Sequence, residues 1–321
     1  MTAFSRFKPL SYNATQLWAV RFTTATDFAL TLLTEAGLLG LAALALIYWK
    51  ALRSLKRKVW EEFDFEKAAS LSLLASLVFL LLFPATLPLI MLFFLLLYLN
   101  ANVNEVTLPR TPALLLASLL AVGVLLLGYY GGRAFLAEYQ YRRALNFLVA
   151  NDGKGSYDTM RETIRLNPYV DRYHASYAQI NMALARSLAQ KGESLTEKDR
   201  NTITQLIQQA IREGRATVTL NPGRSGNWEI LARIYQAIMP FAQGADNFAI
   251  QSFNQSVALD PTNPNLRIAL GGIYYALGRY DEAVRAFELS VLSKPDLANA
   301  HYNLAVAYRE KGEIEKAIEQ M

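Results

Sequence analysis

One acidic residue, Glu35, stands within an apolar stretch that runs from Asp27 to a cluster of bases ending at Lys58. If a membrane helix begins near Phe28, Glu35 lies about 10 Å along it, at a rise of 1.5 Å per residue. Burying a carboxylate in hydrocarbon is costly, so an acid at that depth is a candidate functional residue. The alternative is that the span begins nearer Ala36, and that Glu35 stabilises the helix N-terminus through its negative charge.

The composition favours a membrane protein. Of the 321 residues, 53% are hydrophobic, and the mean hydropathy of +0.15 is unusually high for a soluble chain. With no cysteine and two histidines, disulfides and thiolate zinc sites are excluded, and we expect no metal and no cofactor. The net charge of +5 is modest for this length and does not indicate a nucleic-acid partner.

Four apolar runs precede residue 132 and predict membrane-spanning helices. They are residues 28–49, 68–83, 85–99 and 112–131. The first and last are long enough to cross the hydrocarbon core, which takes about 20 residues. The middle two together are too long for one span and short for two. Pro84 and Pro88 favour two short spans joined by a tight turn, because proline removes a backbone donor and restricts the residue before it; a single span is the alternative.

Bases between the first and second runs predict the orientation. They are Lys50, Arg53, Lys56, Arg57, Lys58 and Lys67. Short loops this rich in lysine and arginine stay in the cytoplasm, which places the N-terminus outside. With four membrane crossings, the residues after Arg133 lie on the outer side. With three crossings, they would lie in the cytoplasm. We expect a multi-pass plasma-membrane protein, with a transmembrane domain at residues 1–131 and an extracytoplasmic domain at residues 132–321.

The polar half of the chain contains an internal repeat. The motifs RLNP, TLNP, ALDP and LSKP end at Pro168, Pro222, Pro261 and Pro295. Small residues recur ten positions after and twelve positions before these prolines. They are Ala178, Ala232, Gly271 and Ala305, and Ser156, Ala210, Ala249 and Ala283. Two antiparallel helices must approach closely at such positions, so the pattern predicts helical hairpins.

This pattern resembles the tetratricopeptide repeat, a helix-turn-helix of 34 residues. The likeness is clearest in LGGIYYALGRYDEAVRAF (270–287) and NLAVAYREKGEIEKAI (303–318). It predicts about five repeats from residue 137, the last truncated, so we expect the natural chain to continue. His174 and His301 both follow a repeat proline by six residues, the place held elsewhere by Trp228 and Arg267, so we interpret both histidines as scaffold and not as metal ligands.

The resemblance implies an α-solenoid whose first helices form a groove for a protein or peptide. The family pattern places seven residues on or near this groove: Asn265, Ile268, Tyr275, Asn299, Tyr302, Val306 and Arg309. Amide and guanidinium donors there could bind a peptide backbone or an acid. The alternative is that these residues are solvated surface.

The stretch LTLLTEAGLLG (30–40) resembles part of the O-antigen ligase and polymerase family of membrane glycosyltransferases. In that family a similar stretch follows an extracytoplasmic loop and leads into the last spans, which implies that this chain is the C-terminal part of a larger bacterial cell-envelope protein. By the same resemblance, Arg21 is a candidate for the pyrophosphate of the lipid-linked donor, and Glu35 for orienting the loop. Many members carry His-Asn just before this stretch, where this chain has Thr26 and Asp27.

Together these features predict an all-α protein, with a bundle of about four transmembrane helices followed by a tetratricopeptide α-solenoid. Two functions remain open. One is a non-catalytic membrane anchor that presents repeats to protein partners, which the absent histidine favours. The other is a glycosyltransferase acting on undecaprenyl-linked glycan. The expected partners are a protein or peptide, the lipid bilayer and, in the second case, a lipid-linked glycan.

Overall fold

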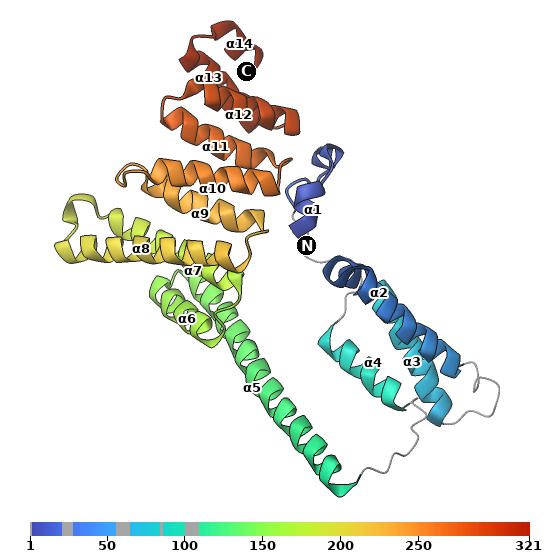
Figure 1. The fold of residues 1–321 in the computed structure, drawn as a ribbon. Coiled ribbons are helices and arrows are strands. Elements are labelled where there is room, and N and C mark those ends of the chain that lie inside the picture. Colours follow the sequence, from blue (N-terminus) through green and yellow to red (C-terminus); the bar gives the residue numbers. More distant parts are fainter. Residues whose placement is uncertain (1, 21–27, 56–64, 84–85, 100–108) are drawn as a thin grey trace. The chain divides into compact units, whose positions relative to one another are not determined.

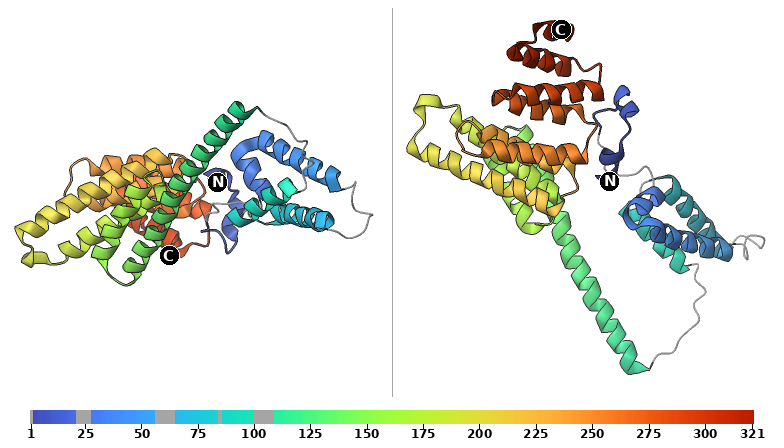
Figure 2. Two further views of the ribbon diagram at one scale, coloured as in Figure 1. Left: turned by 90° about the horizontal axis from the view of Figure 1, so that it is seen from below. Right: turned by 45° about the horizontal axis from the view of Figure 1, so that its top comes forward.

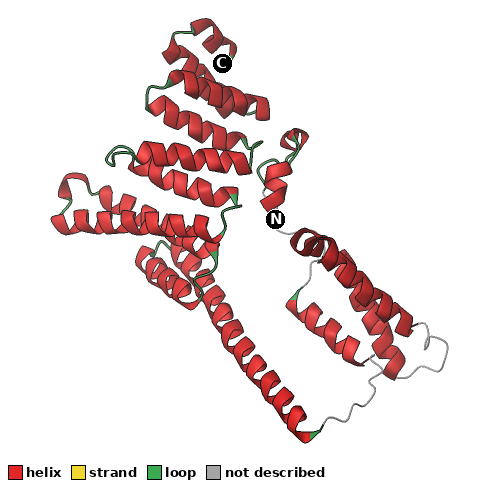
Figure 3. Ribbon diagram, in the orientation of Figure 1, coloured by secondary structure: helices red, strands yellow, loops and turns green. Residues whose placement is uncertain are grey.

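A computed structural model describes residues 2–20, 28–55, 65–83, 86–99 and 109–321. All regular secondary structure within these ranges is helical, which confirms the all-α prediction (Figure 3). The chain divides into two compact units, each described by itself below. One comprises residues 21–113 and Met1, and the other comprises residues 2–20 together with 114–321.

The first unit contains α2 (Phe28–Leu55), α3 (Phe65–Leu82) and α4 (Leu87–Leu99). Helices α3 and α4 are separate, as the two prolines predict, and Pro88 lies in the first turn of α4, where a missing N–H costs nothing. They pack against each other through five buried side chains: Leu73, Leu77, Leu80, Phe93 and Leu96. Pro84 and the basic residues 56–58 lie outside the described residues.

Helix α2 is kinked at Gly37, two residues after Glu35. Gly37 has φ of 66° and ψ of −160°, a conformation almost restricted to glycine because a Cβ would clash with the backbone. The apolar helical stretch Ala36–Trp49 begins at this kink. The backbone therefore favours the second reading of Glu35, at the start of an apolar helix and not inside one.

Helix α5 (Arg110–Val149) is 40 residues long, or about 60 Å at 1.5 Å per residue. Among the described residues it is the one helix long and apolar enough to cross a membrane, and none of its apolar stretch is buried. The other apolar helical stretches have 10–17 residues, so the four-span bundle stays a prediction. The predicted domain boundary at 131/132 falls within α5, whose second half buries Ala137 and Ala144.

The second unit is a stack of helical hairpins (Figures 1 and 2). The second half of α5 pairs with α6, and the later hairpins are α7–α8, α9–α10, α11–α12 and α13–α14. The helices after α5 are α6 (Gly153–Leu166), α7 (Asp171–Ala189), α8 (Glu197–Leu220), α9 (Ser225–Ile238), α10 (Ala245–Leu259), α11 (Pro264–Ala276), α12 (Tyr280–Ser293), α13 (Ala298–Lys311) and α14 (Ile314–Glu319).

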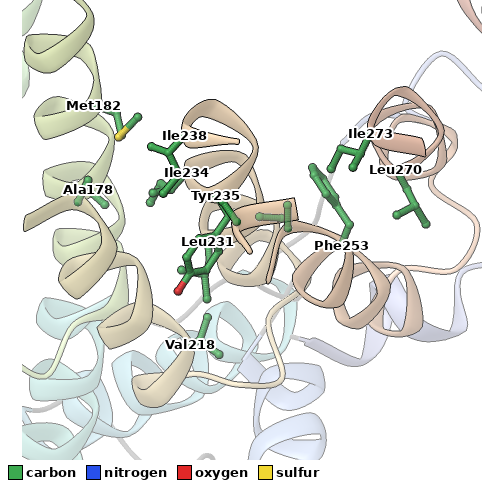
Figure 4. Packing of buried hydrophobic residues seen from close by; sticks show 14 of the residues in the cluster. Ala178, Met182, Val218, Leu231, Ile234, Tyr235, Ile238, Phe253, Leu270 and Ile273 are labelled. Atoms are coloured by element: carbon green, nitrogen blue, oxygen red, sulfur yellow. The ribbon is translucent and has the colours of Figure 1, made fainter. Parts of the chain in front are cut away.

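The eight small residues predicted at the helix crossings are all buried. Gly271 shows why they must be small, since a Cβ there would lie 2.6–2.9 Å from three atoms of the Phe287 ring. Larger side chains fill the seams between these crossings. Figure 4 shows Leu231, Ile234 and Tyr235 of α9 packed within this core.

The residue six positions after each repeat proline forms the same hydrogen bond in four repeats. Its side-chain nitrogen lies 2.8–2.9 Å from the carbonyl oxygen of that proline in His174, Trp228, Arg267 and His301. The second ring nitrogen of His174 is 2.5 Å from Glu213 Oε2, and that of His301 is 2.8 Å from Gln320 Oε1. Both rings thus have a structural role, as the repeat alignment predicted.

Candidate functional site

The first helices of successive repeats form one face of the second unit. Helix α7 contacts α9, and α11 contacts α13. The seven predicted groove residues lie on the last two of these helices. Asn265, Ile268 and Tyr275 come from α11, and Asn299, Tyr302, Val306 and Arg309 come from α13.

Three of the seven residues interact electrostatically: Arg309, Tyr275 and Tyr302. Arg309 donates two hydrogen bonds to Glu310 Oε1, at 2.7 and 3.2 Å. These bonds raise the pKa of Arg309 above its usual value, and the electrostatic influence of Tyr275 and Tyr302 adds to the rise. Tyr302 is 58% exposed. A guanidinium on an accessible surface that also carries aromatic rings can bind a carboxylate or the face of a peptide group.

The other predicted residues are less closely joined. Asn265 and Asn299 are exposed, and the Asn299 side-chain carbonyl already accepts a hydrogen bond of 2.8 Å from Asn303. Ile268 is partly buried and packs against the core of the last repeats, and Val306 is half-buried. Whether these four contact a partner stays a prediction.

A pocket of about 200 Å³ lies on the same type of helix earlier in the solenoid. Its lining comes entirely from α7 and α9: Gln179, Met182, Ala183, Arg186, Ile230, Arg233 and Ile234. Met182 and Ile234 are buried at 8% and 3% exposure and provide an apolar floor. The exposed Gln179, Arg186 and Arg233 give the pocket a polar and positively charged rim.

The two rim arginines are differently engaged. Arg233 is bound to Glu229 on the same helix, at 2.9 Å. Among the residues that the structure describes, none provides a hydrogen-bond or ion-pair partner for the Arg186 guanidinium. An unpaired guanidinium can bind a carboxylate through two parallel hydrogen bonds. The pocket can therefore hold an apolar side chain and an adjacent acid.

This pocket was not predicted, because the groove positions were assigned only in the best-formed repeats. A signal was present. Gln179 and Arg233 both follow their repeat proline by eleven residues, and Val306, a predicted groove residue, occupies the same place in a later repeat. Carrying the groove positions across all repeats would have found these two rim residues, although not Arg186.

Neither catalytic candidate has its side chain among those that the structure describes. Arg21, with Thr26 and Asp27, lies outside the described residues, and for Glu35 the structure describes the backbone in α2. Their role in glycan chemistry stays a prediction.

Comparison with known proteins identifies the repeats. Residues 241–299 and 298–321 match two family models of the tetratricopeptide repeat. Similar solved structures include a MamA protein, with 17% identity, a TM-score of 0.45 and coverage of 57% of this chain and 87% of that one. A thermophilic TPR protein of Thermus thermophilus, TTC0263, has 16% identity, a TM-score of 0.41 and coverage of 57% and 87%. YrrB, described as a TPR protein with an unusual peptide-binding site, has 15% identity, a TM-score of 0.41 and coverage of 56% and 80%. No curated protein matches the chain.

Proposed function

We propose that this protein is a membrane-anchored scaffold that holds a protein or peptide on the face formed by α7, α9, α11 and α13. The observation that carries this proposal is the pocket between α7 and α9, an apolar floor with arginines at its rim. Tetratricopeptide repeats at residues 241–321 support it, because stacked repeats present extended surfaces to partners.

The chemistry of the face points to an acidic peptide with apolar side chains. Arg186 and Arg233 lie at the pocket, and Arg309 lies on α13, farther along the face. A side chain of isoleucine or leucine size matches the apolar floor, and carboxylates beside it would meet the guanidinium groups. Binding of this kind weakens at high salt, because exposed charge pairs are screened.

Selection from a displayed random-peptide library on the purified full chain tests the ligand chemistry. We expect enrichment of peptides that place an acid beside an apolar residue. Arg186→Glu should reduce their binding at least tenfold, because it replaces attraction by repulsion at the pocket rim. Arg200→Glu, an equal charge change on exposed α8, is the matched control. Enrichment of basic peptides, or equal loss with both variants, would overturn the proposed chemistry.

Membrane anchoring and a role in surface glycan assembly complete the proposal. Helix α5 runs unbroken from an exposed apolar stretch into the first repeat, which supports a direct connection between a span and the scaffold. The E-x-G-x-x-G stretch at residues 35–40 supports a place at the C-terminal end of an O-antigen ligase-like or polymerase-like protein. The solenoid would then be extracytoplasmic, near enzymes and lipid-linked glycans at the outer surface of the membrane.

A topology experiment tests the anchoring, and the absence of cysteine makes it clean. Single cysteines are placed at Ser54, beside the basic loop, and at Ser194, exposed at the α7–α8 connection. On intact cells, a membrane-impermeant thiol reagent should label Ser194→Cys and leave Ser54→Cys unlabelled. Lysed cells provide the control for reactivity. The reverse pattern would place the solenoid in the cytoplasm, and labelling of neither in lysed cells would disqualify the positions chosen.

A further inference from the structure

The N-terminal segment belongs to the same compact unit as the solenoid, although residues 21–113 separate the two in sequence. Residues 2–20 contain the short helix α1 (Thr2–Phe7) and the 3-10 turn η1 (Leu10–Ala14), and they cluster with residues 114–321. Helix α1 contacts α10. Figure 1 and the right view of Figure 2 show the segment beside the α10–α12 edge.

Asn13 joins this segment to two successive repeat turns. Its side-chain amide donates hydrogen bonds of 2.7 Å to the carbonyl oxygens of Thr262 and Ser293, and Asn13 is 2% exposed. Ser293 is the last residue of α12, so its carbonyl lacks a partner within the helix. The Asn13 amide satisfies this carbonyl, and both of its hydrogens are used within the contact.

Lys294 completes the contact from the solenoid side. Its ammonium donates a 2.9 Å hydrogen bond to the Asn13 carbonyl, is 2.8 Å from Asp296 Oδ1 and lies 5.1 Å from the centre of the Trp18 ring. Its side chain is 8% exposed. A buried ammonium is tolerated only with such partners, because desolvation of an unpaired charge is costly.

Lys294 also departs from the repeat pattern. The residue before the turn proline is Asn167, Asn221 and Asp260 in the other repeats and lysine only here. Asn167 and Asp260 use their side chains within their own turns, bonding Tyr169 and Asn263. Lys294 instead reaches the N-terminal segment. The one exceptional residue at this repeat position is thus the one that meets Asn13.

We propose that the edge of the solenoid at Thr262, Ser293 and Lys294 is a docking surface whose occupant is residues 2–20 of this same chain. A bilayer cannot lie between two groups that are hydrogen-bonded to each other. The segment and the solenoid therefore share one side of the membrane, and the chain between them crosses an even number of times. This consequence rests on the proposed anchoring, and it selects four crossings over three, with α3 and α4 as two separate spans.

Amine footprinting of the full chain in lipid nanodiscs tests the docking. Lys191 is the internal reference, because it is also ion-paired, at 3.0 Å from Asp199, but its side chain is 47% exposed. We expect Lys294 to acetylate at least tenfold more slowly than Lys191 in the unmodified protein. Asn13→Ala should remove most of this protection, and the exposed Asn254→Ala on α10 should not. Equal acetylation of the two lysines in the unmodified protein would overturn the docking.

A second variant tests the docking from the solenoid side. Lys294→Asn restores the residue found in two other repeats, so the turn itself is expected to fold. Amide hydrogen exchange over residues 10–20 should accelerate at least tenfold, and exchange within α13 should not change. Unchanged exchange over residues 10–20 would show that Lys294 does not hold the segment and would overturn the proposal.

Thiol labelling of cells tests the shared side. Single cysteines at Thr15, which is exposed, and at Ser194 should respond alike to an impermeant reagent. Opposite responses would overturn the proposal. If all three variants, Thr15→Cys, Ser194→Cys and Ser54→Cys, are labelled on intact cells, the membrane anchoring is overturned instead. The amine footprinting then tests the docking by itself.

Discussion

Two adjacent glycines in α11 should respond oppositely to the same substitution. A Cβ on Gly271 would lie 2.6, 2.8 and 2.9 Å from three atoms of the Phe287 ring, whereas a Cβ on Gly272 would meet nothing within 4 Å. Phe287 is 1% exposed, so its ring has little room to move. Overpacking of this kind costs about 1–3 kcal/mol, and alanine returns about 1 kcal/mol of helix propensity over glycine.

We therefore expect Gly271→Ala to lower the local opening free energy of α11 and α12 by up to about 2 kcal/mol. Gly272→Ala should raise it by about 0.5–1 kcal/mol. Hydrogen exchange with peptide resolution measures both, since about 1.4 kcal/mol is tenfold in the opening equilibrium. Phe287→Leu combined with Gly271→Ala should show a favourable coupling in a double-mutant cycle. Equal stabilisation by the two alanines would refute the packing of α11 on α12 described above.

Burial lowers the pKa of His174, but its hydrogen bonds to Glu213 and to the Pro168 carbonyl raise it more, so the pKa in the folded protein lies above 6.5. Protonated His174 therefore stabilises the folded protein. This stabilisation is complete below pH 6.5 and is lost as the pH rises through the folded-state pKa. Thermal melting should accordingly show stability falling with pH over that window, with the slope absent in His174→Gln. Asn227 is 2% exposed, and its side-chain amide donates hydrogen bonds to the carbonyls of Thr217 and Asn221. Asn227→Ala should therefore lower the opening free energy of α9, measured by hydrogen exchange, by about 1–3 kcal/mol. The exposed control Asn254→Ala should change it by less than about 0.5 kcal/mol. The purified chain should transfer no sugar from an undecaprenyl-linked donor; turnover that Glu35→Gln abolishes, with the fold intact, would contradict the scaffold proposal.

The solenoid could be predicted from sequence because its information is periodic. Each repeat packs on its neighbour in the same way, so small residues at fixed offsets report the helix crossings. The same reasoning correctly made His174 and His301 equivalent to Trp228 and Arg267. It overlooked a buried hydroxyl five residues before each turn proline. Thr163, Thr217, Ser256 and Ser290 occupy this place and are fully buried.

The N-terminal contact could not be predicted in this way. Asn13 and Lys294 are far apart in sequence, and neither is repeated at the equivalent position of another repeat. Only the folded chain brings them together. Lys294 is exceptional at its repeat position, which indicates a special contact there. The sequence does not indicate that Asn13 is the partner in this contact. The kink at Gly37 was similarly hidden, because a glycine in an apolar run is compatible with a straight helix as well as with a break.

Site-specific photo-crosslinking in native membranes tests the central claim most directly. A photoreactive amino acid replaces Tyr302, which is 58% exposed on the proposed binding face, or Leu292, which is 70% exposed on α12. We expect a discrete protein adduct from position 302, reduced by Arg309→Glu, and none from position 292. Equal adducts from both positions, or an adduct from position 292 alone, would contradict the claim that the first helices of the repeats hold the partner.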